Sequence, residues 1–223
     1  MQAKLGFMYF GHPNMQAMAT PQTLTYLALG DSYTVGEKVK VFENFPYHTV
    51  DLLRRSGMAV MAPDIVAVTG WTTDELAAGI AQRALLEQYD LVSLLIGVNN
   101  QYRGREVAGY EKEFEALLQQ AIAFAGGQAS RVFVLSIPDW GATPFAADRD
   151  RAQIAREIDA YNAANRAVTT AHGAHYLDIT PSTRLNAATE AYMAEDGLHP
   201  SGLEYKIWAD GLSLQMQAQL AAE

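Results

Sequence analysis

The sequence predicts an α/β protein, a three-layer α/β/α sandwich in which a five-stranded parallel sheet lies between two layers of helices. Three observations predict this fold. Five short apolar runs, rich in β-branched residues, alternate along the chain with longer helical patterns. Such alternation is typical of parallel sheets whose connecting helices cover both faces. The 223 residues, 49% hydrophobic and 18% charged, suffice for one sizeable core, and no internal repeat or low-complexity linker divides them.

The predicted strands are apolar runs bounded by turn-forming residues, and the predicted helices lie between and after them. The strands cover residues 23–29, 59–68, 91–96, 132–137 and 175–179. The helices cover residues 45–55, 74–86, 110–125, 153–172 and 203–220. Thr72 or Thr73, followed by two acidic residues, is typical of a helix N-cap. Gly126 and Gly127 supply the stop for the third helix.

The amino-terminal segment has the order of a secretion signal but not its length. Lys4 is followed by an apolar stretch from Leu5 to Phe10, which is shorter than the usual stretch of about 7–15 residues. We therefore expect a flexible extension over residues 1–20, a single domain over residues 21–223 and a cytoplasmic location, with a secreted or periplasmic location as the alternative. No run approaches the roughly 18 apolar residues of a membrane span, so we expect no stable membrane insertion.

Composition excludes several classes of function. Lys and Arg number 16 against 25 Asp and Glu, and the net charge of −9 disfavours nucleic acid as a partner. The chain has no cysteine, which removes disulfides, thiolate metal sites and cysteine nucleophiles. His172 and His175 are the closest pair of histidines, yet no third ligand stands at an obvious spacing. We expect neither a metal nor a cofactor, and the oligomeric state stays open.

Polar residues follow three of the predicted strands at the edge where parallel sheets bind ligands. Ser32 comes directly after the first strand, Gly70 after the second, and Asn99 after the third. A serine hydroxyl on a strand-to-loop turn suits a nucleophile, although Gly-Asp-Ser is also a common turn sequence. A backbone N–H at a glycine and a side-chain amide suit the stabilisation of an oxyanion.

A carboxylate and an imidazole stand three residues apart near the end of the chain, as Asp196 and His199. The carboxylate can hold the imidazole in one tautomer and favour the imidazolium that forms when a serine loses its proton. The other histidines compete less well, since they fall within predicted helices, at the start of a strand or in the amino-terminal segment: His12, His48, His172 and His175.

The order of these motifs resembles that of the SGNH (GDSL-type) hydrolases. The motifs are Gly30-Asp-Ser32, then Gly70, then Gly97-x-Asn99, then Asp196-x-x-His199, and they span about three quarters of the chain. The resemblance implies the flavodoxin-like fold of that family. It also implies a Ser32–His199–Asp196 triad and an oxyanion hole formed by Ser32, Gly70 and Asn99.

Two positions depart from the family pattern. Tyr33 stands where the family motif has leucine, and Asn100 stands where many relatives carry aspartate. Residues 97–104 and 136–145 resemble stretches of bacterial lysophospholipase-like SGNH proteins. We expect five residues that follow the strands to contact substrate: Trp71, Asn100, Tyr102, Arg103 and Trp140.

The resemblance implies a serine esterase for a small-molecule ester, either a short-chain acyl ester or a lysophospholipid-like substrate. Two alternatives keep the same site, a carbohydrate O-deacetylase and a thioesterase. A third is a non-catalytic flavodoxin-like binding module in which Ser32 is only a turn residue. The chain lacks Gly-rich phosphate loops, which disfavours a nucleotide-binding version of that module.

Overall fold

The sheet has five parallel strands, as the sequence predicts. The computed structural model describes residues 23–222, and the expected extension over residues 1–20 lies outside them. The strands are β1 (Tyr26–Gly30), β2 (Asp64–Ala67), β3 (Leu91–Leu95), β4 (Val132–Leu135) and β5 (His175–Leu177), in the order β2-β1-β3-β4-β5. Every neighbouring pair is parallel. All residues of β1, β3 and β4 are buried, which explains why they read as continuous apolar runs.

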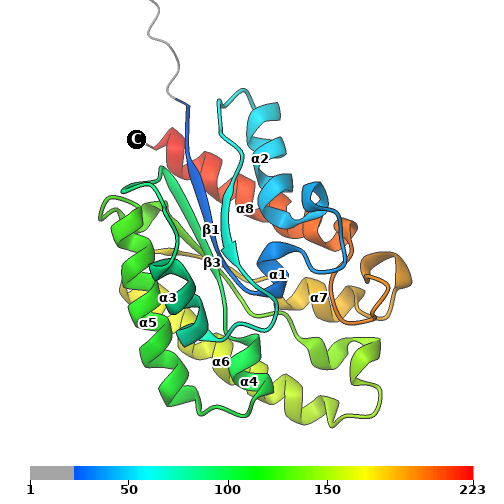
Figure 1. Ribbon diagram of the computed structural model, residues 1–223. Helices are drawn as coiled ribbons and strands as arrows, with labels where there is room; N and C mark the ends of the chain where they lie inside the picture. Colours follow the sequence, from blue (N-terminus) through cyan, green and yellow to red (C-terminus); the bar gives the residue numbers. More distant parts are fainter. Residues whose placement is uncertain (1–22, 223) are drawn as a thin grey trace, which may run out of the picture.

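Helices cover both faces of the sheet, which confirms the three-layer sandwich (Figure 1). One layer contains α2 (Phe45–Arg55) and α8 (Gly202–Ala221). The other contains α3 (Thr73–Ala81), α5 (Val107–Phe124) and α6 (Arg151–Ala171). Short helices fill the connections: α1 (Ser32–Val35), α4 (Val98–Tyr102), α7 (Thr180–Asn186), η1 (Val41–Glu43), η2 (Ala129–Arg131), η3 (Trp140–Ala142), η4 (Pro144–Ala146) and η5 (Glu190–Tyr192).

The strand order reverses direction at β1, which lies between β2 and β3. In register, Gly30 at the end of β1 pairs with Ala67 of β2 on one side and with Leu95 of β3 on the other. The loops that follow these three strands therefore start at the same level of the sheet. Open α/β sheets bind ligands at such a switch point, beyond the carboxyl ends of the strands.

All five strands and the second helix are shorter than predicted, and the second strand and the second helix lose the most residues. Strand β2 starts at Asp64 rather than at residue 59, because Pro63 has no N–H for the ladder, and Val60 forms only an isolated bridge with Leu24. Helix α3 ends at Ala81 rather than at residue 86, and the Leu86 N–H donates to the hydroxyl of Tyr89 instead of extending the helix.

The predicted helix boundaries at Thr72 and at the glycine pair are confirmed. Thr72 is the N-cap of α3 and forms a capping box with Glu75. Gly126 follows the end of α5 with φ 66°, the left-handed conformation in which glycine carries no steric penalty. Within residues 23–222, no helix has the length and apolar character needed to cross a membrane.

Candidate active site

The turn after β1 presents Ser32 as the first residue of α1. The Asp31 carboxylate accepts the Tyr33 N–H at 3.0 Å and caps the helix. The turn is tight, since a Cβ on Gly30 would lie 2.1 Å from Thr34 Oγ1 and 2.4 Å from the Leu95 carbonyl oxygen. Glycine at position 30 therefore lets β1 run directly into α1 and places Ser32 at the carboxyl edge of the sheet.

The carboxylate beneath this turn lies in an unfavourable environment. Asp31 is 1% exposed, and its Oδ2 atom has no hydrogen-bond partner among the described residues. Burial raises the pKa of Asp31 from 3.8 to about 7, and the hydrogen bond from the Tyr33 N–H offsets only part of this effect.

The loop before α8 joins His199 to Asp196. The Asp196 Oδ2 atom lies 2.6 Å from His199 Nδ1, while Oδ1 accepts the N–H groups of Leu198 and His199 at 3.0 and 2.9 Å. Burial acts to raise the pKa of Asp196, but these hydrogen bonds outweigh it and lower the pKa below its usual value. An ionised carboxylate only accepts hydrogen bonds, so Nδ1 carries the proton and Nε2 is the ring nitrogen available to a ligand.

The loop after β2 is held at three successive residues. The Thr69 hydroxyl donates to Glu37, the Gly70 carbonyl accepts from Arg103 Nη2 at 2.7 Å, and the Trp71 carbonyl accepts from Asn99 Nδ2 at 2.9 Å. Gly70 has φ 86°, a conformation that favours glycine. Hydrogen bonds therefore tie the loop to two other segments, the turn at Glu37 and helix α4.

These segments enclose one pocket of about 240 Å³. It brings together Ser32, Gly70, Asn99 and His199, and Asp196 lies behind the imidazole. The remaining lining is mostly apolar or aromatic and consists of Tyr33, Thr69, Val98, Tyr102, Trp140, Phe145 and Leu198. Among the described residues, no Asp, Glu, Lys or Arg side chain lines the pocket. The pocket lining thus combines a few polar groups with mostly apolar and aromatic side chains.

Of the five residues expected to contact substrate, Tyr102 and Trp140 line this pocket and the other three do not. Asn100 is fully buried and uses its amide to bind the backbone and hydroxyl of Thr73. The Trp71 ring occupies the space beside Gly79 of α3. The Arg103 guanidinium turns to the Gly70 carbonyl and to Glu75. These three residues hold the walls of the pocket together.

Four further residues line the pocket without having been predicted as substrate contacts: Thr69, Val98, Phe145 and Leu198. Leu198 had a signal, because it stands between two residues of the Asp196-x-x-His199 motif. Phe145 lies in η4, after the fourth strand, at the end of the stretch 136–145 that resembles lysophospholipase-like proteins. Its place in the pocket depends on the fold of the chain from η3 to η4, which local sequence does not reveal.

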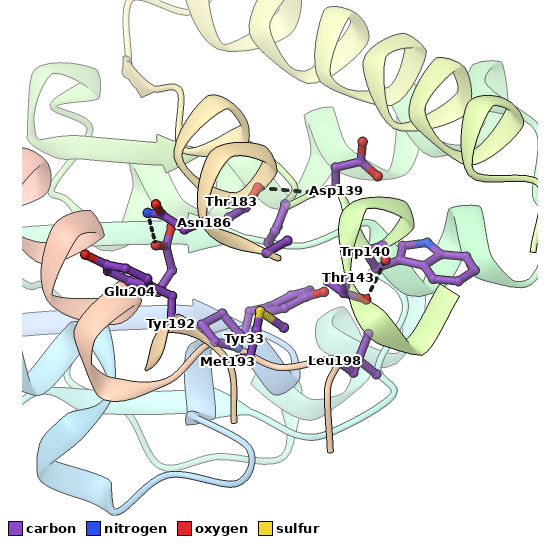
Figure 2. Close-up of a pocket in the computed structure, with 13 residues that line it drawn as sticks. Tyr33, Asp139, Trp140, Thr143, Thr183, Asn186, Tyr192, Met193, Leu198 and Glu204 are labelled. Carbon is purple, nitrogen blue, oxygen red and sulfur yellow. Dashed lines mark hydrogen bonds between the residues drawn. The ribbon is translucent and has the colours of Figure 1, made fainter. Parts of the chain in front are cut away.

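A second, smaller cavity of about 20 Å³ shares Tyr33 with this pocket, and Figure 2 shows the residues that line it. Tyr33, Trp140 and Leu198 line both cavities, and Met193 and Glu204 help close the second. Its volume holds about one water molecule, so it is too small for a substrate. Over residues 23–222, no group of three or more His, Asp or Glu side chains is arranged to hold a metal ion.

Solved structures of other proteins share the fold of this chain. A lipase/acylhydrolase from Enterococcus faecalis superposes with a TM-score of 0.70 at 19% identity, covering 88% of this chain and 97% of that one. The psychrotrophic esterase EstA from Pseudoalteromonas sp. gives 0.64 at 17% identity, covering 88% and 98%. The acetylxylan esterase Axe2 from Geobacillus stearothermophilus gives 0.68 at 17%, covering 86% and 94%. At these identities the similarity establishes the fold.

The family assignment comes from the sequence profile. No curated protein sequence matches the chain. Residues 28–207, however, match the GDSL-like Lipase/Acylhydrolase family, and this range includes all four motifs from Gly30 to His199. The chain therefore belongs to the GDSL-like lipase/acylhydrolase family, and it is a carboxylic ester hydrolase.

Proposed function

We propose that the protein is a serine esterase that hydrolyses short-chain acyl esters, with Ser32 as nucleophile, His199 as general base and Asp196 as the carboxylate that orients the imidazole. The observation that carries this proposal is the lining of one pocket by Ser32, Gly70, Asn99 and His199. These residues supply a hydroxyl, a base and hydrogen-bond donors around one space, which is what acyl transfer requires.

In the proposed mechanism, Ser32 Oγ attacks the ester carbonyl while His199 Nε2 accepts the hydroxyl proton. Asp196 keeps the proton on Nδ1 and stabilises the imidazolium. The imidazolium then protonates the leaving alcohol, and an acyl group remains on Ser32. Water attacks this acyl-enzyme with His199 again as the base, which releases the acid and restores the hydroxyl.

The oxyanion of each tetrahedral intermediate would accept hydrogen bonds from the N–H groups of Ser32 and Gly70 and from the Asn99 amide. Asn99 Nδ2 already donates one hydrogen to the Trp71 carbonyl, which leaves its second hydrogen for the substrate. The same bond orients the amide before substrate arrives. Donors held in this way cost little reorganisation when the negative charge develops.

The lining favours small, uncharged esters. No Lys or Arg side chain among the described residues lines the pocket to bind a phosphate or carboxylate, and the net charge of −9 repels anions. Apolar side chains cover much of the wall. These features favour a short acyl ester over a substrate that carries an anionic group next to the scissile bond.

The test is labelling by a fluorophosphonate probe together with hydrolysis of p-nitrophenyl acetate. We expect the wild-type protein to be labelled and to turn over the ester, and Ser32→Ala to lose both activities. Ser130→Ala, in η2 at the amino end of β4 and therefore remote from the pocket, is the matched control and should retain both. Labelling of Ser32→Ala at the wild-type rate would overturn the proposal.

A further inference from the structure

Three neighbouring aromatic rings line the pocket, and we call Tyr102, Trp140 and Phe145 the aromatic wall. The ring centroids of Tyr102 and Trp140 lie 5.2 Å apart at 65°, and those of Trp140 and Phe145 lie 6.1 Å apart at 63°. Both are edge-to-face arrangements, which stabilise aromatic pairs. The rings come from α4, η3 and η4, so the wall joins the segment that follows β3 to the segment that follows β4.

The wall has a buried centre and an open rim. Trp140 is 5% exposed, whereas Tyr102 is 51% and Phe145 is 44% exposed. Two large aromatic side chains that are half exposed at the mouth of a pocket offer apolar area that a ligand can cover. Because Trp140 is already buried, most of the apolar area that a ligand can remove from water belongs to Tyr102 and Phe145.

The Trp140 ring is held from outside the pocket. Its Nε1–H donates to Gln101 Oε1 at 2.7 Å, and Gln101 Nε2 donates to Glu157 Oε2 at 2.6 Å. Glu157 Oε1 in turn accepts from Gln153 Nε2 at 2.7 Å. Gln101 is 5% exposed, so its amide has little access to water as an alternative partner. Because the indole N–H is used by Gln101, Trp140 presents only its apolar ring to the pocket.

From these contacts we infer that the aromatic wall binds the acyl group of the ester and that Gln101 is a positioning residue for Trp140. The inference rests on the proposed esterase function. The alcohol must leave after His199 protonates it, so it needs an open path. The acyl group stays on Ser32 until water attacks, and it is the part of the substrate that benefits from a buried, immobile surface.

The substrate class follows from the same contacts. The acyl group is uncharged and longer than acetyl, since an acetyl methyl offers little area to three rings. One methylene in an apolar pocket changes kcat/KM by about 10–200-fold. The wild-type enzyme should therefore prefer p-nitrophenyl butyrate to p-nitrophenyl acetate by at least about 10-fold.

The experiment compares kcat/KM for p-nitrophenyl acetate, butyrate, hexanoate and octanoate in wild type and variants. Phe145→Ala removes exposed wall area, and Gln101→Met removes the acceptor of the indole N–H at nearly constant length. Gln153→Met is the matched control, because Gln153 binds the same Glu157 carboxylate but does not contact Trp140. We expect the butyrate-to-acetate ratio to fall by about 5–10-fold in Phe145→Ala and Gln101→Met, mainly through KM, and to stay unchanged in Gln153→Met.

A second variant separates positioning from general stability. Trp140→Phe removes the N–H together with part of the ring, so its butyrate-to-acetate ratio should fall at least as far as that of Gln101→Met. The double variant Gln101→Met/Trp140→Phe should have the same ratio as Trp140→Phe, since the hydrogen bond that Gln101→Met removes is already absent there. The positioning role would be overturned if the butyrate-to-acetate ratio fell in proportion to the melting temperature of each variant, whether or not the variant lacks this hydrogen bond.

Other outcomes overturn different statements. Ser32 labelling by the fluorophosphonate with an unchanged butyrate-to-acetate ratio in Phe145→Ala and Gln101→Met would overturn the acyl-binding role and leave the esterase proposal intact. The series methyl acetate, butyl acetate and a peracetylated monosaccharide varies the alcohol and keeps the acyl group constant. If Phe145→Ala and Gln101→Met changed kcat/KM only within this series, the wall would bind the alcohol or a sugar and not the acyl group. Failure of the probe to label wild-type Ser32 would overturn the proposed function itself.

Discussion

Substitution of Gly70 by alanine tests whether the hydrogen bonds to the Gly70 loop are strong enough to hold its conformation. At φ 86° an alanine is strained by about 1–2 kcal/mol, and the only described atom within 4 Å of its added Cβ would be Arg103 Nη2, at 4.0 Å. Three hydrogen bonds hold the loop, at Thr69, Gly70 and Trp71. At roughly 0.5–1.5 kcal/mol each, together they contribute about 1.5–4.5 kcal/mol, and the middle of this range exceeds the strain. We therefore expect the loop to keep its shape in Gly70→Ala.

The expected result is a loss of stability without a large loss of activity. Gly70→Ala should lower the melting temperature by about 2–4 °C for each kcal/mol of strain, while kcat falls less than about 10-fold. Gly57→Ala is the control, because Gly57 has φ 92°, open space around its Cβ position and no contact with the pocket. Both variants should lose similar stability in thermal unfolding followed by circular dichroism.

Removal of one hydrogen bond to the loop should let the strain at residue 70 exceed the stabilisation from the remaining hydrogen bonds. In Gly70→Ala combined with Arg103→Met, the charged donor to the Gly70 carbonyl is gone, so residue 70 can relax to negative φ and turn its N–H away. Loss of one oxyanion donor costs about 10²–10³ in kcat, so the double variant should fall well below the product of the single effects. A kcat loss of about 10² in Gly70→Ala alone, with stability equal to Gly57→Ala, would refute the reasoning.

Three further predictions concern the proposed donors and the buried carboxylates. Asn99→Ala should lower kcat by about 10²–10³ with little change in KM, measured with p-nitrophenyl butyrate; an unchanged kcat would remove Asn99 from the oxyanion hole. Asp196→Asn should lower kcat by about 10⁴ because the amide no longer selects the proton on Nδ1 of His199; equal turnover in both proteins would argue against an orienting carboxylate. The pKa of Asp31, raised from 3.8 to about 7, means that its ionisation destabilises the folded protein as pH rises through this window, by on the order of 4 kcal/mol when complete. The free energy of unfolding in urea should therefore be higher for Asp31→Asn, relative to wild type, at pH 8 than at pH 5. An equal difference between the two proteins at both pH values would contradict the raised pKa.

Buried strands and the four motifs were predictable because their signals are local. An apolar run such as residues 91–96 cannot be exposed, and a serine directly after such a strand must lie at the edge of the sheet. Parallel strands then bring Ser32, Gly70 and Asn99 to one level without any knowledge of side-chain contacts. His199 lies far along the chain, and the carboxylate three residues before it was the signal that singled it out.

The roles of neighbouring side chains were not predictable in the same way. Helix α4 is five residues long, too short for a hydrophobic period to show which way each side chain points. Asn100 was expected at the substrate, yet its amide is buried against Thr73. Gln101 gave no signal, because its partners Trp140 and Glu157 lie 39 and 56 residues away along the chain. Such contacts are set by tertiary packing rather than by local sequence.

The compactness of α4 has a consequence for protein engineering. Four successive side chains serve four different neighbours: Asn99 the Gly70 loop, Asn100 helix α3, Gln101 the indole of Trp140, and Tyr102 the mouth of the pocket. Each residue of a helix is rotated by about 100° from the one before it. A single inserted or deleted residue would therefore turn every later side chain of α4 away from its present contact. Libraries that seek new ester specificities should therefore vary the identity of Tyr102 and keep the length of this segment constant.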